Sequence, residues 1–265
     1  MGIINRLKES GFGFKKSLGQ NFIVDEGYLD GFVSELGLTK DDLVIEVGTG
    51  AATLTRVLGK HAKQVISYEI DKQLEKTIMS QVFGMDNIQI RFQDALEADL
   101  GVLTPYKVVA NIPYYITTPL VMKFMRDENC MEICVLVQDE FGRRMVAAPG
   151  GKEYGALSVA VKSWGSAKIV KKVPRTLFVP QPNVDSVFVV VKRHPEKFTY
   201  DVNELERLLK GLFSNRRKTI ANGLMNVCGL SREDAEARLV NVGIDPTKRP
   251  EQLTVQQFLK LVAIK

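Results

Sequence analysis

Short apolar runs alternate with amphipathic stretches from residue 26 to about residue 191. Compact apolar runs such as Leu43–Val47 predict buried strands, and Glu26–Leu36 has apolar residues at helical spacing. Val184–Val191 is apolar at most positions, as in a strand that is buried on both faces. This repeated strand–helix order predicts an α/β fold in which helices cover both sides of a mostly parallel sheet. The predicted strands are 43–47, 65–69, 88–92, 107–110, 133–137, 169–173 and 184–191, and the predicted helices are 26–36, 53–58, 71–83, 118–125, 140–146 and 157–164.

The pattern changes after His194-Pro195, where helical periodicity continues without a further strand. The predicted helices there are 203–213, 217–227, 232–240 and 255–262. We therefore expect three parts, a mobile basic arm over 1–20, an α/β domain over 21–195 and a small helical domain over 196–265.

Composition narrows the class of protein. The chain has 265 residues, of which 45% are hydrophobic and 25% charged, as in a well-packed soluble protein. It has no signal peptide and no apolar run long enough to span a bilayer, so we expect no membrane. Cys130, Cys134 and Cys228 have no metal-ligand spacing, which predicts no metal site and a reducing cytoplasm. A net charge of +5 is compatible with binding a polyanion.

The segment Asn111-Ile112-Pro113-Tyr114 directly follows the apolar run Val108–Ala110. In an open α/β sheet, ligands bind at the carboxyl ends of the strands. An amide, carbonyls and an aromatic face at that place can bind a planar base that carries an exocyclic amine. The segment predicts the catalytic loop of an amino-group methyltransferase that acts on nucleic acid. The alternative is a proline-containing turn after a core strand.

A glycine-containing loop follows the first strand. Gly48 and Gly50 allow a tight turn and a close approach to a ligand. Glu69 ends the next strand about 20 residues further on, where a carboxylate accepts hydrogen bonds from ribose hydroxyls. A nicotinamide dinucleotide fits this pattern too, but Thr53 stands where the third glycine of that fingerprint belongs. A nucleoside without phosphates, such as S-adenosylmethionine, fits better.

Two further polar residues follow the same logic. Asp94 ends the third strand and can accept a hydrogen bond from an adenine amine, or it can cap a turn. Asn21 can reach the methionine carboxylate of the donor, or it can begin a turn. Asp25 is expected to be the N-cap of helix 26–36.

In this order the motifs resemble the rRNA adenine N6-dimethyltransferase family, and within it the bacterial small-subunit (16S) branch. Thr49 and Ile112 depart from it, since many relatives have proline and leucine there. The matching stretches are 19–25, 46–50, 69–71, 93–95 and 111–119, and those that favour the 16S branch are 178–186, 215–219 and 243–246.

The resemblance implies a Rossmann-like class I S-adenosylmethionine-dependent methyltransferase with a small all-α C-terminal domain that binds rRNA. It implies transfer of methyl groups to N6 of two adjacent adenines near the 3′ end of 16S rRNA, giving N6,N6-dimethyladenosine during small-subunit biogenesis. The implied partner is 16S rRNA in an immature 30S particle, and we expect a cytoplasmic monomer. The residues expected to bind the donor are Asn21, Ile23, Gly48, Gly50, Glu69, Asp94 and Asn111.

At the substrate amine, we expect the Asn111 oxygen and a carbonyl of Ile112 or Pro113 to accept hydrogen bonds from N6. Pro113 stiffens the loop. Tyr114 is expected to stack on the flipped base, with Phe178 on its other face. Either aromatic ring can instead belong to the core.

Basic residues at the arm and in the helical domain are the candidate RNA contacts. We expect the phosphate-binding residues to be Lys15, Lys16, Arg216, Arg217 and Lys218. Three alternatives stay open. They are a 23S rRNA adenine N6-methyltransferase that confers macrolide resistance, a non-catalytic RNA-binding assembly or transcription factor, and a dehydrogenase.

Overall fold

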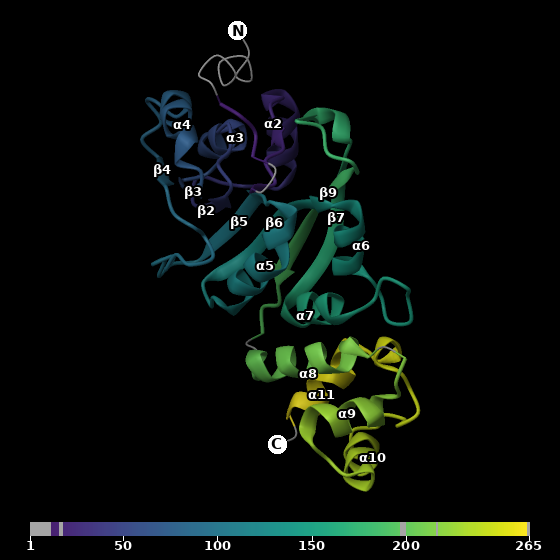
Figure 1. Cartoon of the computed structure of the whole chain (residues 1–265). Coiled ribbons are helices and arrows are strands. Elements are labelled where there is room, and N and C mark those ends of the chain that lie inside the picture. The colour runs from purple at the N-terminus through teal and green to yellow at the C-terminus, as the bar shows by residue number, and fades with distance from the viewer. Residues whose placement is uncertain (1–11, 16–17, 197–199, 216, 264–265) are drawn as a thin grey trace. The chain divides into compact units, whose positions relative to one another are not determined.

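The computed structural model in Figure 1 describes residues 12–15, 18–196, 200–215 and 217–263. The chain has two compact units, one of Met1–Gly142 with Ile169–Val190 and the other of Arg143–Lys168 with Val191–Lys265. The second unit includes residues 143–168, which the sequence placed in the α/β domain. The difference arises because helix α7 (Ala156–Trp164) packs with helices α8 and α11 of the C-terminal segment.

A seven-stranded sheet forms the centre of the α/β part, with strand order β4-β3-β2-β5-β6-β9-β7. The pairs from β4 to β6 are all parallel, and β2 lies between β3 and β5. The strands are β2 Leu43–Val47, β3 Gln64–Tyr68, β4 Ile88–Arg91, β5 Tyr106–Asn111, β6 Cys130–Gln138, β7 Gly165–Val173 and β9 Ser186–Arg193. This confirms the predicted mostly parallel sheet.

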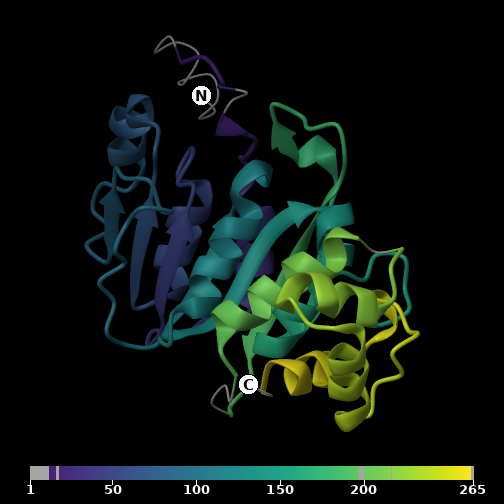
Figure 2. The same ribbon diagram turned by 60° about the horizontal axis from the view of Figure 1, so that its bottom comes forward.

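Helices cover both faces of the sheet (Figures 1 and 2). Helices α2 (Glu26–Glu35) and α3 (Thr53–His61) pack together over one face, and α5 (Thr117–Arg126) lies on the other. Helix α2 begins as predicted, with the Asp25 carboxylate accepting a hydrogen bond from the Tyr28 backbone N–H at 2.9 Å. No helix among the described residues is both long and apolar enough to cross a bilayer.

The chain reverses its direction across the sheet between β2 and β5. From β2 it builds outward to β3 and β4, and it then returns to the other side of β2 as β5 and continues to β6. The carboxyl ends of β2 and β5 therefore meet at the topological switch point, where open α/β sheets bind ligands. The glycine loop and the Asn111 loop start there.

Several predicted elements have different bounds. The predicted helix 71–83 is a 3-10 turn, Lys72–Leu74, followed by the shorter α4, Glu75–Gln81. Glu69 lies just beyond β3 instead of inside it. The sequence also did not predict a separate pair of two-residue antiparallel strands, β1 (Phe22–Ile23) with β8 (Phe178–Val179), because so short a run has no detectable periodicity. Further short elements are 3-10 turns at Tyr114–Ile116, Arg175–Leu177 and Pro250–Gln252, and α6 at Asp139–Val146.

The second unit is helical around a core of its own. Helix α8 (Val202–Ser214) buries Leu205, Leu208, Leu209 and Leu212 against its neighbours, and α11 (Val255–Ala263) adds Phe258 and Leu261. The remaining helices are α9 (Ile220–Cys228) and α10 (Arg232–Asn241). The predicted start of α9 was wrong. Thr219 caps a helix that begins at Ile220, because its hydroxyl accepts from the Asn222 N–H.

Candidate functional site

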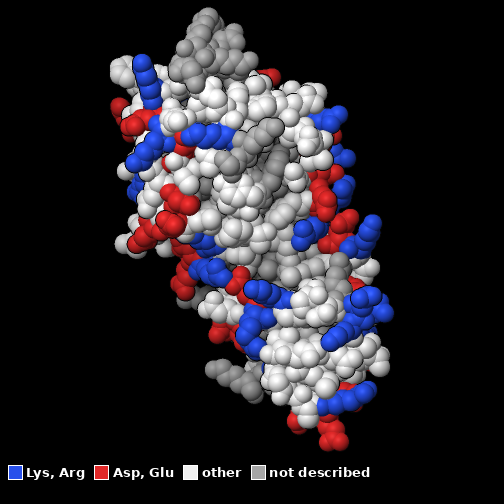
Figure 3. Space-filling view, viewed as in Figure 1, with Lys and Arg blue, Asp and Glu red and all other residues white. Residues whose placement is uncertain are grey.

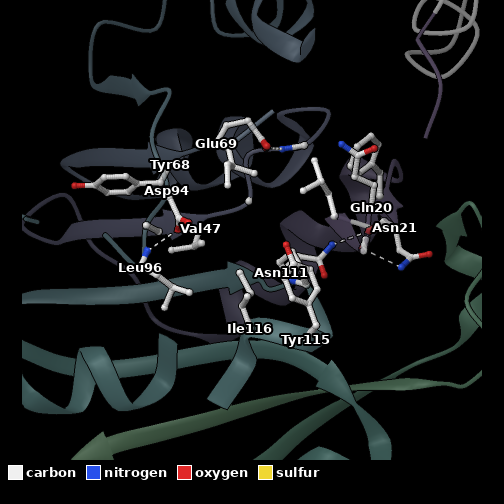
Figure 4. Close-up of a pocket in the computed structure, with 18 of the residues that line it drawn as sticks. Gln20, Asn21, Val47, Tyr68, Glu69, Asp94, Leu96, Asn111, Tyr115 and Ile116 are labelled. Carbon is white, nitrogen blue, oxygen red and sulfur yellow. Dashed lines mark hydrogen bonds between the residues drawn. The ribbon is translucent and has the colours of Figure 1, made fainter. Parts of the chain in front are cut away.

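A cavity of about 260 Å³ opens at the carboxyl ends of β2, β3 and β5. Its walls come from five segments that are far apart in the sequence, and Figure 4 shows most of the side chains. The lining residues are Leu18–Phe22, Val47, Gly48, Gly50, Tyr68–Ile70, Gln93–Leu96, Asn111, Pro113, Tyr115 and Ile116. The predicted residues Asn21, Gly48, Gly50, Glu69, Asp94 and Asn111 are thus brought together in one pocket.

Glu69 is only 6% exposed, and its carboxylate is held by backbone hydrogen bonds. Its Oε2 accepts from the Gly50 N–H at 2.8 Å, and its Oε1 accepts from the Asp71 N–H at 2.9 Å. Burial raises the pKa of the Glu69 carboxyl, although these backbone hydrogen bonds oppose the rise. Each carboxylate oxygen can accept more than one hydrogen bond, so Glu69 retains acceptor capacity toward the cavity. This geometry suits recognition of ribose hydroxyls.

Two glycines of the loop after β2 stand at positions where a side chain would be strained. Gly48 has φ +84°, and a Cβ there would lie 3.2 Å from the Asn111 carbonyl oxygen. Gly50 has φ +56°, and a Cβ there would lie 3.0 Å from the Phe22 ring. Both positions therefore require glycine for conformation and for space. The loop fits a nucleoside that approaches the backbone closely.

Asp94 lies in the loop that follows β4. Its Oδ1 accepts from the Leu96 N–H at 2.8 Å, so the predicted turn-capping contact exists, yet the residue also lines the cavity. Figure 4 places Asp94 toward one end of the cavity and Asn21 toward the other, with Asn111 and Glu69 between them. An adenine, a ribose and an amino-acid tail bound in that order would each meet a polar side chain.

Asn111 ends β5, and its side-chain amide has a defined orientation. Its Nδ2 donates to the Asn21 carbonyl oxygen at 3.0 Å, while the Asn21 Nδ2 donates to the Gly19 carbonyl at 3.1 Å. With the amino group directed at Asn21, the Asn111 Oδ1 is left as the acceptor that the amide presents to a ligand. This is the orientation needed to accept a hydrogen bond from an exocyclic amine.

The rest of the Asn111 loop is folded into a short turn. The Pro113 carbonyl accepts from the Ile116 N–H at 3.1 Å and from the Thr117 hydroxyl at 3.3 Å. Because Pro113 already accepts two internal hydrogen bonds, the Ile112 carbonyl is the better second acceptor for a substrate amine. The side chain of Tyr114 lies outside the described residues, so its predicted stacking role stays a prediction.

Two other predicted site residues do not line this cavity. The Phe178 ring is 3% exposed and packs in the core with Phe188 and Ile23. Ile23 lines a second, smaller cavity of about 30 Å³, which shares Gly48 and Asn111 with the first. Stacking of Phe178 on a base requires its ring to leave this core packing, and that role stays a prediction.

The described part of the N-terminal arm contacts the donor side of the site. Lys15 Nζ lies 2.7 Å from Asp71 Oδ1, and Gln20 Nε2 donates to Asp71 Oδ2 at 2.8 Å. Phe12 and Phe14 pack near Phe22. Burial alone would raise the pKa of Asp71, but hydrogen bonds from Lys15 and Gln20 hold it below its usual range.

The arm contacts are linked directly to the Glu69 carboxylate, because the Asp71 N–H donates to it. The sequence did not predict that Gln20 and Asp71 connect the arm to Glu69. Their only signal was the adjacency of Asp71 to Glu69, and a contact across 51 residues has no periodicity that would reveal it. Lys15, predicted to bind RNA, is placed in an ion pair with Asp71, and its contact with RNA stays a prediction.

A buried polar cluster lies behind the glycine loop. Glu46 is fully buried, and its Oε2 accepts hydrogen bonds from the hydroxyls of Thr55 at 2.6 Å and Ser67 at 2.5 Å. The Thr49 and Ser67 hydroxyl oxygens are 2.6 Å apart. Burial raises the pKa of Glu46 to about 8, so the carboxyl is mostly protonated at neutral pH.

The basic residues of the helical unit lie outside the cavity. Arg217 and Lys218 are exposed in the turn that precedes α9, whereas the sequence placed them inside that helix. Lys16 and Arg216 lie outside the described residues. Figure 3 shows basic and acidic side chains interspersed over the viewed face. The RNA contacts therefore stay predictions.

Comparison with known proteins identifies the family. The family model of ribosomal RNA adenine dimethylase matches residues 11–265. A Clostridioides difficile protein named ribosomal RNA small subunit methyltransferase A is 41% identical over 258 residues, which cover 93% of this chain and 89% of the relative.

Two solved structures are similar over most of the chain. A dimethyladenosine transferase from Plasmodium falciparum has a TM-score of 0.77 at 27% identity, covering 89% of this chain and 94% of that one. The 23S rRNA methyltransferase ErmE has a TM-score of 0.70 at 28% identity, covering 91% and 98%.

These findings confirm the class I methyltransferase fold and S-adenosylmethionine as the methyl donor, and they exclude the dehydrogenase and non-catalytic alternatives. The cavity at the switch point agrees with them, because its glycine loop and strand-end acids suit a nucleoside without phosphates. The chain is a methyltransferase that belongs to the ribosomal RNA adenine dimethylase family.

Proposed function

We propose that this enzyme methylates N6 of two adjacent adenines near the 3′ end of 16S rRNA, giving N6,N6-dimethyladenosine during small-subunit biogenesis. The observation that carries the proposal is the Asn111 amide. It stands at the switch point beside the donor cavity, with its amino group bound to the Asn21 carbonyl and its oxygen left for an exocyclic amine.

Each donor contact is assigned to a residue by its place in the cavity. Asp94 accepts from the adenine amine, Glu69 accepts from the ribose hydroxyls, and Asn21 lies at the methionine end. Gly48 and Gly50 provide space between these contacts. Ile23 lines the smaller neighbouring cavity, and we assign it to the same end of the donor.

The chemistry needs an amine whose lone pair is available. S-adenosylmethionine supplies a methyl group on a positively charged sulfur. The lone pair of adenine N6 is delocalised into the ring, so N6 is a poor nucleophile. Hydrogen bonds from N6–H to the Asn111 Oδ1 and the Ile112 carbonyl favour a pyramidal nitrogen with an exposed lone pair. Each transfer would break one S–CH₃ bond, whose electron pair stays on sulfur in S-adenosylhomocysteine, and would replace one N–H bond with an N–CH₃ bond as a proton leaves to solvent.

Positioning supplies most of the rate in such a site, since no strong general base is required. Pro113 stiffens the loop because it has a fixed φ and its carbonyl is held by Ile116 and Thr117. The adenine must leave its stack to enter the pocket. We assign Tyr114 to one face of the flipped base and Phe178 to the other, where stacking contributes about 1–3 kcal/mol per base.

We further propose that the substrate is rRNA in an immature 30S particle and that the enzyme works as a cytoplasmic monomer. The small-subunit assignment is supported by relatives at 38–41% identity that are named ribosomal RNA small subunit methyltransferase A. ErmE, which is named for 23S rRNA, is less similar in sequence at 28%. Residues 196–265 and the basic arm over 1–20 are proposed to bind phosphates through Lys15, Lys16, Arg216, Arg217 and Lys218, with affinity that falls as salt rises.

The proposal is tested by incubating the protein and labelled S-adenosylmethionine with immature 30S particles, free 16S rRNA and 23S rRNA. We expect label in 16S rRNA, most of it in the particle. Asn111→Ala should abolish most transfer while RNA binding is retained, and the matched control Asn241→Ala, at an exposed position of α10, should transfer normally. Label in 23S rRNA alone would move the assignment to the ErmE-like activity. Normal transfer by Asn111→Ala would refute the role of the amide.

A further inference from the structure

A lysine on α5 is bonded to the loop that carries Asp94. The Lys123 Nζ donates to the carbonyl oxygens of Ala95 at 2.8 Å, Leu96 at 2.8 Å and Ala98 at 2.5 Å. An ammonium group has three N–H donors, and here three carbonyls of one loop accept from it. Few side chains could hold that loop so completely through its backbone.

The bound loop buries two small side chains, Ala95 and Ala98, which are 5% and 2% exposed. The loop is closed on itself by the Leu96 N–H bond to the Asp94 carboxylate and by the Ala98 N–H bond to the Asp94 carbonyl. Lys123 adds three hydrogen bonds that join this local turn to helix α5.

The charge of Lys123 also acts on Asp94. Partial burial lowers the pKa of the Lys123 ammonium, while the nearby carboxylates of Asp94 and Asp99 raise it. The ammonium thus lies near two carboxylates of the same segment, and of these Asp94 lines the cavity. The Lys123 ammonium and the Asp94 carboxylate therefore attract each other across the loop.

Helix α5 contacts the Asn111 loop as well. At its first residue, the Thr117 hydroxyl donates to the Pro113 carbonyl, and further along Lys123 binds the Asp94 loop. Helix α5 therefore contacts both loops of the site. Its first residue holds the Asn111 loop on the substrate side, and Lys123 holds the Asp94 loop at the adenine end of the donor cavity.

We propose that Lys123 is a positioning residue for the methyl donor. By binding three loop carbonyls, it holds the Asp94 carboxylate where it accepts a hydrogen bond from the donor's adenine amine. This inference rests on the proposed function of Asp94. Lys123 thereby contributes to the enzyme's preference for adenine over other purines. A base with a carbonyl in place of the amine offers Asp94 no donor at that position.

The test compares two ligands by isothermal titration calorimetry, S-adenosylhomocysteine and S-inosylhomocysteine, which differ in that group and in the proton that hypoxanthine carries on N1. The wild type is expected to prefer the adenine ligand by about tenfold or more, as expected for one hydrogen bond to a charged group. Lys123→Met should lose most of this preference by weakening the adenine ligand, and its KM for the donor should rise while kcat stays within about twofold. Lys76→Met, an exposed lysine of α4, is the matched control and should behave as the wild type.

Three further measurements keep the test decisive. Lys123→Gln is a milder change that should show the same loss of preference if Lys123→Met does not fold. In the double variant Asp94→Asn with Lys123→Met, the effects on the adenine ligand should not add, because both act through one hydrogen bond. Faster amide hydrogen exchange over residues 95–98 should accompany the loss.

The outcomes separate the two assignments. Wild-type protein without any preference for the adenine ligand would overturn the function of Asp94 and the inference with it. A clear wild-type preference that persists in both folded Lys123 variants would overturn the inference for Lys123 alone. Equal weakening of both ligands would show a general structural function and would also overturn it.

Discussion

Replacing Glu69 with glutamine tests the donor site at its most constrained residue. Both oxygens of the buried carboxylate accept backbone hydrogen bonds, from Gly50 at 2.8 Å and from Asp71 at 2.9 Å. Glutamine replaces one acceptor oxygen with an amino group. That amino group and the backbone N–H are both donors, so they cannot form a hydrogen bond with each other. The glycine loop must shift, or one N–H must lose its partner.

The magnitude follows from the hydrogen bonds that are lost. A hydrogen bond to a charged acceptor contributes about 1.5–3 kcal/mol. Loss of one such bond to a ribose hydroxyl therefore weakens donor binding by about 10- to 150-fold. We expect the Kd of S-adenosylhomocysteine to rise by this factor in Glu69→Gln. Glu75→Gln, at an exposed position in the first turn of α4, should leave it unchanged.

Isothermal titration calorimetry with S-adenosylhomocysteine and its 2′-deoxy and 3′-deoxy analogues provides the assay. In the wild type, removal of the hydroxyl that Glu69 binds should weaken the ligand, and in Glu69→Gln the same removal should have little further effect. A folded Glu69→Gln protein that binds the donor with the wild-type Kd would refute the assignment. Full additivity with both deoxy analogues would do so too.

The same carboxylate predicts a pH dependence. Because burial raises the pKa of Glu69 above 4.5, protonation removes the charged acceptor at a higher pH than for an exposed glutamate. Donor affinity should therefore fall as the pH decreases through this raised pKa, and Glu69→Gln should lack that component. An identical acid profile for the two proteins, measured by calorimetry, would contradict this.

Three other changes have defined outcomes. Gly48→Ala should weaken donor binding more than tenfold and lower the melting temperature, because φ is +84° and the added Cβ meets the Asn111 carbonyl. Gly101→Ala, at φ +60° with open space around it, is the control for backbone strain alone, and equal donor affinity in both variants would count against the steric argument. Asp71→Asn should accelerate tryptic cleavage of the N-terminal arm, and an unchanged rate would show that the carboxylate does not hold it. The raised pKa of Glu46 contributes on the order of 5 kcal/mol of stability, which is complete below pH 4.5 and is lost as the pH rises through about 8. The free energy of unfolding should therefore depend less on pH in Glu46→Gln, and parallel curves of the two proteins by urea denaturation would disprove this.

Much of the architecture was predictable because its signals are local. Parallel strands that are buried on both faces appear as apolar runs, and the Asn111 loop, the glycine loop and the strand-end acids each follow such a run. Strand order at the switch point then places them together, which explains why Gly48, Glu69, Asp94 and Asn111 all line one cavity.

What the sequence did not predict depends on contacts across the fold. The pairing of β1 with β8 involves two residues on each side, and the bonds of Asp71 to the arm join segments that share no periodicity. Lys123 has the sequence context of an ordinary helix lysine, and only the folded structure places its ammonium against three carbonyls. Burial of Phe178 in the core was one of two interpretations that the sequence left open.

We infer above all that the enzyme methylates adjacent adenines of small-subunit rRNA at its Asn111 loop. Mass spectrometry of nuclease fragments from 16S rRNA, after reaction of unmethylated 30S particles with the enzyme and S-adenosylmethionine, tests it most directly. We expect two neighbouring N6,N6-dimethyladenosines in one fragment near the 3′ end, and we expect neither with Asn111→Ala. Methylation at any other atom or site, or none by a folded enzyme that binds the donor, would contradict it.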